Sequence, residues 1–396
     1  MNSNLPSGAG SSFQEPVHPS LRISVIVPAK DEADFITCTL DALRMQVDGS
    51  GRRVNYDLFE VLVLANNCTD DTYGICRSYQ LMHPDFHLYV SCVKLAAEIA
   101  HIGTVRRLLM DSAYRRVISV AGPGGIIVST DADSEVDSQW IHHILKEMDK
   151  GVDVVGGRIL PRETPALSKI HHLRDVTYRF LKTRLESELD PCLSNPWPRH
   201  FQCYGPSLAV TCDIYERAGR LPAIPYLEDE EFRKALKRID ARIRHAPNVR
   251  IYTSSRLEGR VGFGFSVQLK QWGDMSLRRE QQMVESLESL SFQLGLKKEL
   301  RCLWAAAVAG KKVLMDINAL ALRLNFDGEE LLSMLYQSVY FESLWEQIEK
   351  KLIHTNTAIT RLQPIADAIR DFRHHFSLRA RLDNRIIATG QKQMEN

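Results

Sequence analysis

Two aspartates, Asp131 and Asp133, stand one residue apart directly after the apolar run of residues 125–130. Carboxylates at that spacing can face one divalent cation, because Mg²⁺ and Mn²⁺ prefer hard oxygen ligands and leave coordination positions open for phosphate oxygens. A metal ion held there would neutralise the negative charge that builds on a departing diphosphate. Taken alone, however, a pair of aspartates after a strand is more typical of a helix cap or a turn.

A run of four acids at residues 228–231 is the second candidate for chemistry. A carboxylate beside a hydroxyl group can act as a general base, and we select Asp229 for this role, with Glu228 as the group that positions it or raises its pKa. The same run also opens a predicted helix whose apolar face starts at Phe232, and acids at a helix start need no catalytic reason. Both interpretations stay open at this point.

Three arginines are candidates for binding phosphate, since the guanidinium fork matches phosphate oxygens. Arg106 follows Gly103 in a predicted helix, where it could equally belong to a solvated basic face. Arg256 and Arg260 follow a short predicted strand at residues 250–252. They lie in a polar loop whose nearby glycines would let it move.

Strands and helices alternate through the first third of the chain. Short β-branched runs predict buried strands, and apolar residues at helical spacing predict helices. The predicted strands are residues 23–28, 61–64, 89–93 and 125–130, and the predicted helices between them include residues 33–45 and 105–117. This alternation predicts an α/β fold with a parallel sheet and right-handed crossovers. Ligands in such sheets lie at the carboxyl ends of strands, which is where the aspartate pair stands.

Composition divides the chain into three regions. Residues 1–20 are rich in Ser, Gly and Pro, and they predict a disordered tail that is not a secretory signal. Residues 21–265 carry the predicted sheet. Residues 266–390 keep an apolar stripe at helical spacing and predict a mostly helical C-terminal region, through which two copies could form a homodimer.

Several classes of protein are disfavoured by composition. The 50 basic and 49 acidic residues give a net charge of +1, which argues against a general nucleic-acid partner, because such binding needs a concentrated basic face. The eight cysteines form no C-x-x-C pair, as expected of thiols in a reducing cytosol. No apolar run approaches the roughly 18–20 residues of a transmembrane segment. We therefore expect a cytoplasmic protein, with peripheral contact with the inner membrane left open.

Five motifs in sequence order resemble glycosyltransferase family 2, which has the GT-A fold. The run at residues 25–32 resembles the opening strand of that family, and residues 66–72 resemble its second nucleotide-binding turn. The remaining three are residues 103–106, the aspartate pair with Ala132 between, and the Glu-Asp motif at residues 227–230. The resemblance covers residues 22–260 and implies a GT-A catalytic domain over residues 21–265, a mixed sheet flanked by helices, with the helical region appended.

The resemblance also implies a site. Asp131 and Asp133 would bind the metal, Mn²⁺ or Mg²⁺, and Asp229 and Glu228 would be the catalytic acids. The nucleotide sugar would contact Pro28, Ala29, Glu32, Asn66, Asn67, Gly103, Arg106, Asp131, Ala132, Asp133, Arg256 and Arg260. A UDP-sugar is the default donor and an unidentified hydroxyl the acceptor. The family more often has Asp at position 66 and Asn at position 31, which leaves the base open.

Four hypotheses about the function follow from these features. The first is an inverting, metal-dependent transfer by single displacement, with Asp229 as base. The second is a retaining GT-A transferase of the glucosyl- or mannosyl-glycerate type. A nucleotidyltransferase is a weaker rival, because its glycine- and lysine-rich opening signature is missing. A non-catalytic nucleotide-sugar-binding module would bind donor without turnover. The missing Q-x-x-R-W motif argues against a processive synthase.

Overall fold

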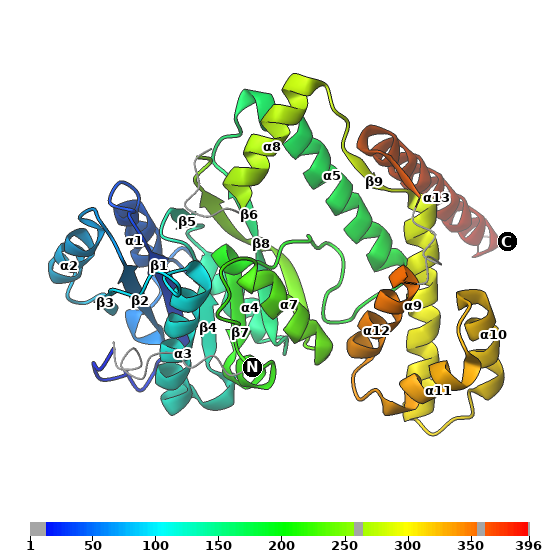
Figure 1. Ribbon diagram of the computed structural model, residues 1–396, viewed down its shortest axis with the longest axis horizontal. Helices are drawn as coiled ribbons and strands as arrows, with labels where there is room; N and C mark the ends of the chain where they lie inside the picture. The colour runs from blue at the N-terminus through cyan, green and yellow to red at the C-terminus, as the bar shows by residue number, and fades with distance from the viewer. Residues whose placement is uncertain (1–12, 257–263, 355–360, 395–396) are drawn as a thin grey trace. The chain divides into compact units, whose positions relative to one another are not determined.

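The computed structural model describes residues 13–256, 264–354 and 361–394 (Figure 1). The chain divides into two compact units. The sheet unit comprises residues 1–163 and 193–267, and the helical unit comprises residues 164–192 and 268–396. The division that we predicted, at residue 265, stays a prediction. It treated the two parts as successive segments, whereas residues 164–192 here join the helices that come last in the chain.

The sheet unit is built on one mixed sheet, with strand order β3-β2-β1-β4-β7-β6-β8-β5. Strands β1, β2, β3 and β4 run parallel, whereas β7 is antiparallel to both β4 and β6, and β5 is antiparallel to β8. The strands are β1 (Ile23–Ala29), β2 (Phe59–Asn66), β3 (Leu88–Val93), β4 (Ile126–Ser129), β5 (Ser134–Val136), β6 (Val154–Pro161), β7 (Leu208–Thr211) and β8 (Ile243–Thr253). Every residue of β1 and β2 is buried, which explains their near-continuous apolar sequence.

Helices cover both faces of this sheet (Figure 1). Alternate residues of β1 point to opposite faces: Val25 belongs to the core beneath α1 and α4, whereas Ile26 belongs to the core beneath α3 and α7. The helices are α1 (Ile36–Arg44), α2 (Thr72–Met82), α3 (Ile102–Ala121), α4 (Trp140–Met148), α6 (Cys212–Arg217) and α7 (Glu228–Arg238). The predicted α/β class, with a mixed sheet flanked by helices, is therefore confirmed.

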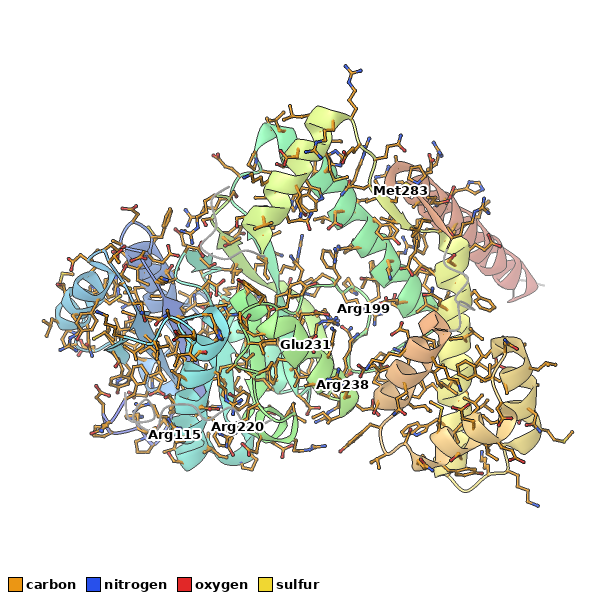
Figure 2. The ribbon with its side chains drawn as sticks, viewed as in Figure 1. Arg115, Arg199, Arg220, Glu231, Arg238 and Met283 are labelled. Atoms are coloured by element: carbon orange, nitrogen blue, oxygen red, sulfur yellow. The ribbon has the colours of Figure 1, made fainter. Side chains whose placement is uncertain are left out.

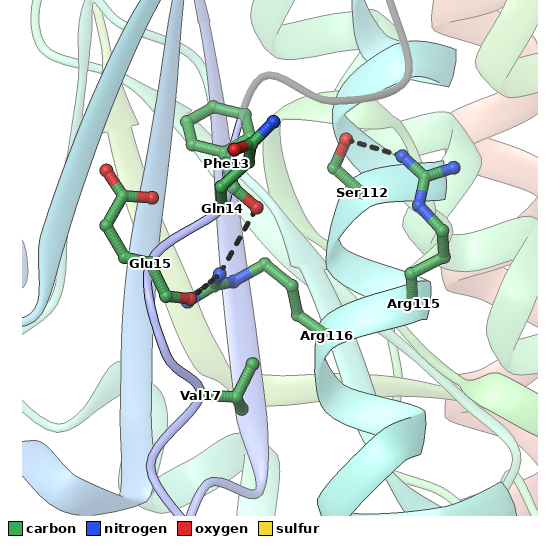
Figure 3. A pocket seen from close by; sticks show the side chains of 7 residues that line it. All are labelled: Phe13, Gln14, Glu15, Val17, Ser112, Arg115 and Arg116. Carbon is green, nitrogen blue, oxygen red and sulfur yellow. Dashed lines mark hydrogen bonds between the residues drawn. The ribbon is translucent and has the colours of Figure 1, made fainter.

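Part of the predicted N-terminal tail is fixed to the sheet unit. Residues 1–12 lie outside the described residues, but Phe13 and Val17 pack against the core on the α3 side. Arg116 donates to the carbonyl of Glu15 at 2.8 Å and forms an ion pair with the buried carboxylate of Glu60 at 2.7 Å. A cavity of about 250 Å³ remains between this segment and α3 (Figure 3), lined by Phe13, Gln14, Glu15, Val17, Ser112, Arg115 and Arg116.

The helical unit has two apolar cores, as expected for the predicted helical region. Tyr178 and Leu185 of α5 pack with Leu290 of α9 and Phe372 of α13, and a second core joins α9, α10, α11 and α12. The elements are α5 (Ala166–Leu189), α8 (Phe265–Arg278), β9 (Met283–Glu285), α9 (Leu287–Val308), α10 (Leu314–Leu324), α11 (Gly328–Gln337), α12 (Phe341–His354), β10 (Leu362–Pro364) and α13 (Ile365–Met394). Within the described residues, no helix combines the length and apolarity needed to cross a bilayer.

Candidate active site

The turns that follow β1 and β2 hold each other in place. The Asp31 carboxylate accepts a hydrogen bond from the Thr69 amide at 2.6 Å, and Asp70 accepts one from the Ala33 amide at 2.9 Å. The Thr69 amide is the main cause that lowers the pKa of Asp31 below its ordinary value. Asp31 itself has a left-handed backbone, with φ of 51°. These reciprocal bonds fix the segment that carries Glu32.

Glu32 forms an ion pair with Arg256 near the aspartate motif. Its two carboxylate oxygens accept from Nη2 and Nη1 of Arg256 at 2.7 and 3.1 Å. The same Nη2 lies 3.0 Å from Oδ2 of Asp133, which also accepts from the Ser254 hydroxyl at 2.6 Å. Glu32, Asp133 and Arg256, all predicted to contact the nucleotide sugar, thus meet in one network, although they are far apart in the sequence.

A second network is centred on Arg106, whose side chain is only 4% exposed. Its Nη2 donates to Oδ1 of Asp131 at 2.6 Å, and its Nη1 forms an ion pair with Glu228. Burial raises the pKa of Asp131 to about 6 even though Arg106 opposes this shift, and burial also raises the pKa of Glu228. One guanidinium therefore joins the aspartate motif to the Glu-Asp motif, and Arg106 does not lie on a solvated helix face.

Two glycines allow this close packing. A Cβ atom on Gly205 would collide with the Arg106 guanidinium, and a Cβ atom on Gly103 would collide with the backbone carbonyl of Ile224. The family resemblance predicts that Gly103 contacts the nucleotide sugar. In the structure it lets the loop before α7 approach the start of α3, while the predicted ligand contact stays a prediction.

Asp229 lies in the first turn of α7 and is held by backbone amides. Its Oδ2 accepts from the Gly205 amide at 2.9 Å and its Oδ1 from the Glu230 amide at 2.8 Å. Because each carboxylate oxygen has two lone pairs, both oxygens can still accept a further proton donor. Leu227, two residues before Asp229, has a left-handed backbone with φ of 58°, which is unusual for a bulky side chain.

The asparagines after β2 differ in what they contact. Asn67 uses both ends of its amide on Leu95, with two bonds of 2.9 Å, so it fixes the loop after β3. Asn66 is 3% exposed, and its Oδ1 has no hydrogen-bond partner among the described residues. Pro28 and Ala29 are buried at the end of β1, one strand away. Since a buried polar atom without a partner is costly, Asn66 is the best-placed of these residues to accept a bond from a ligand.

The carboxylates that follow β4 are suitable ligands for a hard divalent cation. Asp131 and Asp133 supply carboxylate oxygens, which Mg²⁺ and Mn²⁺ prefer. Between them Ala132 is buried, and its carbonyl accepts from the Thr39 hydroxyl at 2.9 Å, so the backbone of the motif is fixed. Oδ2 of Asp133 already contacts the Arg256 cation. Elsewhere in the described chain, Asp31, Cys68 and Asp70 lie close enough to share a metal ion, but both aspartates there hold backbone amides.

Sequence reasoning missed two residues that the structure places in the site. Ser254 donates to Asp133, and the Gly205 amide donates to Asp229. Ser254 stands in the polar run after β8, so its position was a usable signal, whereas the approach of Gly205 depends on the folded sheet. Arg260 lies outside the described residues. Glu231, the last of the four acids, is labelled in Figure 2. It forms an ion pair with Lys234 and contacts none of the predicted residues in the bonds above.

One family model and several solved structures are similar to this chain. Residues 24–197 match the family model described as "Glycosyl transferase family 2". No curated protein matches. Among solved structures, TarS of S. aureus is 16% identical with a TM-score of 0.42, and the alignment covers 70% of this chain and 43% of TarS.

Two further solved structures are similar over most of their length. TarS residues 1–349 in complex with UDP are 15% identical with a TM-score of 0.43, over 90% of this chain and 92% of that one. The mannosyltransferase PcManGT from Pyrobaculum calidifontis, in complex with GDP-Man and Mn²⁺, is 18% identical with a TM-score of 0.42, over 87% and 89% of the two chains. This chain thus spans less than half of the length of the first of these TarS chains.

Proposed function

We propose, from the match of residues 24–197 to the family model "Glycosyl transferase family 2", that this chain is a glycosyltransferase that transfers a sugar from a nucleotide-diphosphate sugar to a hydroxyl acceptor. The transfer is an inverting single displacement. The acceptor oxygen bonds to the anomeric carbon as the bond from that carbon to the diphosphate breaks, and the hydroxyl proton passes to Asp229. A UDP-sugar is the first donor to test.

The observation that carries this proposal is the position of Arg106 between Asp131 and Glu228. A helix cap would need neither a buried guanidinium nor a second acid from a distant helix. The shared guanidinium instead keeps the donor-side carboxylate and the acceptor-side acids at one end of the sheet. Such an arrangement suits a reaction in which a leaving group and a proton depart from two sides of one carbon.

Asp229 is a better base than its neighbour Glu228. The Glu228 carboxylate is buried against Arg106, where it serves as a counter-ion. Asp229 is fixed in orientation by the amides of Gly205 and Glu230, while its remaining lone pairs stay available to an acceptor hydroxyl. Glu228 therefore acts on the reaction by holding Arg106, and Asp229 takes the proton.

The donor would lie across the ends of β1, β2 and β4. Asp131 and Asp133 would hold the divalent metal, which when bound neutralises charge on the departing diphosphate. The Oδ1 atom of Asn66 would accept a hydrogen bond from the base, and Glu32 would accept one from the ribose or the base. Arg256 already contacts Asp133 and would reach the diphosphate from there. Arg106, predicted for the same role, is better placed to hold Asp131 than to bind phosphate.

A nucleotide-sugar panel with Mn²⁺ or Mg²⁺ tests the proposal, with release of the nucleotide diphosphate as the readout. UDP-glucose, UDP-N-acetylglucosamine and GDP-mannose should be included. Asp133→Ala should abolish metal-dependent donor binding, whereas Asp229→Asn should preserve binding and remove transfer. Glu231→Gln is the matched control from the same turn of α7, because its carboxylate is 39% exposed and pairs with Lys234. The base assignment fails if Asp229→Asn keeps full activity.

The alternative hypotheses predict different outcomes in these experiments. Net retention at the anomeric carbon would exclude the single displacement at Asp229. A binding module would bind a donor in the panel without releasing diphosphate. If no donor shows metal-dependent binding or turnover, the proposed function is wrong as a whole.

A further inference from the structure

In the helical unit α5 and α8 lie side by side (Figure 1), and both helices expose large apolar side chains. The Ser168 hydroxyl donates to the Leu269 carbonyl at 2.6 Å, and the Ser276 hydroxyl donates to the Leu167 carbonyl. Leu277, next to Ser276, is 68% exposed and Leu167 is 54% exposed. We call this region the α5–α8 surface; its apolar members are Leu167, Ile170, Leu173 and Leu277.

Helical spacing continues the apolar surface along α5. Ile170 and Leu173 follow Leu167 at intervals of three residues, which places them side by side on the helix. Their side chains are 49% and 51% exposed. Single exposed leucines are common, but a run of neighbouring large apolar side chains marks an interaction site.

Exposed basic side chains lie on the same two helical segments as these apolar ones. Lys169 on α5, Lys270 on α8 and the pair Arg278 and Arg279 at the end of α8 are all exposed. Over residues 164–173 and 264–280, which include all four of these cations, the exposed acids are Asp274 and Glu280. The Glu280 carboxylate lies 3.7 Å from the Arg278 guanidinium, and both side chains are exposed. The surface thus carries four cations against two anions. An exposed pair at that distance neutralises little charge.

We infer that the α5–α8 surface binds the surface of an anionic phospholipid bilayer. Leucine and isoleucine side chains can enter the boundary between headgroups and acyl chains, while lysine and arginine attract anionic lipids. A second copy of the chain is the less suitable occupant, because a symmetric contact would bring the same cations together. This inference goes beyond the proposed function and does not depend on which sugar is transferred.

Co-sedimentation with lipid vesicles tests the inference on the full chain. We expect binding to vesicles in which about a third of the lipid is phosphatidylserine, and little binding to pure phosphatidylcholine. Binding should fall as NaCl rises from about 0.05 to about 0.5 M, because salt screens the attraction. The double substitution Arg278→Gln with Arg279→Gln should weaken binding to the anionic vesicles only.

A separate substitution tests the apolar contact between this surface and the bilayer. Leu277→Gln should lower the vesicle partition constant about tenfold, since a buried leucine contributes at least that much. Leu322→Gln is the matched control, because Leu322 is 83% exposed on a different helix, α10, and the substitution should leave binding unchanged. The inference is overturned if anionic vesicles are not bound or if Leu277→Gln binds like the unmodified chain. It is equally overturned if sedimentation velocity shows a dimer that Leu277→Gln dissociates.

Discussion

Replacing Arg106 by methionine tests the central ion-pair network most directly. The substitution keeps the length of the side chain but leaves the carboxylates of Asp131 and Glu228 without their shared cation. Removing one partner of a buried pair costs about 3–5 kcal/mol, because the remaining charge stays desolvated. We expect a loss of about 4 kcal/mol in the free energy of unfolding at pH 7. Urea unfolding of both proteins measures it.

The loss of unfolding free energy caused by Arg106→Met should be smaller at acidic pH. Burial already raises the folded-state pKa of Asp131 to about 6, above its ordinary value of 3.8, and raises that of Glu228 too. Without the Arg106 cation both values rise further, so the folded variant binds more protons than the unfolded chain between about pH 4 and pH 7. Its stability relative to the unmodified protein therefore increases as the pH falls toward 5.

An exposed pair provides the control for this experiment. Arg22 and Asp149 lie 3.0 Å apart with side chains 48% and 60% exposed. Arg22→Met should cost less than about 1 kcal/mol at either pH. A loss for Arg106→Met as small as this, or one that does not change with pH, would falsify the role of Arg106 as the counter-ion of two buried acids.

Three further outcomes follow from the same structure. Because the folded-state pKa of Asp131 is about 6, its contribution to stability is fully present below its ordinary pKa of 3.8 and is lost as the pH rises through about 6. Asp131→Asn should therefore flatten this part of a pH series of urea midpoints, and an unchanged slope would contradict the raised pKa. Leu227→Gly relieves a left-handed backbone that costs a leucine about 1–2 kcal/mol, so the thermal midpoint should stay level or rise, and a clear fall would show that the side chain stabilises the fold. Gly205→Ala places a methyl group on the Arg106 guanidinium and should lower both diphosphate release and thermal stability, whereas Gly124→Ala, which meets nothing within 4 Å, should change neither; equal behaviour of the two variants would refute the close approach.

The strands of the parallel half of the sheet could be predicted closely from the sequence. Residues 23–28 were expected as a strand and β1 spans Ile23–Ala29, because a strand buried on both faces needs a continuous apolar run. Strand β7 (Leu208–Thr211) had no such signal. It has four residues, and its place between β4 and β6 depends on pairing with segments far away in the chain.

The sequence predicts where the candidate site residues lie in the sheet, but it does not predict which residues they contact. The sequence shows which side chains follow each strand, so Glu32, Asp131 and Asp133 could be expected at one end of the sheet. It does not show that Glu32 pairs with Arg256, 224 residues later, or that Arg106 is buried. Such pairings depend on loops whose course is set by glycine contacts such as that of Gly205.

Helix α5 belongs to the helical unit but is made long before its partners. Tyr178 and Leu185 pack against α9 and α13, and α13 is the last helix of the chain. At the usual rate of synthesis, about 5–20 residues per second, α5 leaves the ribosome roughly 10–40 s before α13. Its apolar face has to remain uncovered or be held by a chaperone during that interval. A shortened chain that ends at residue 265 keeps α5 and loses these partners, so we expect it to aggregate rather than to fold as a free-standing catalytic domain.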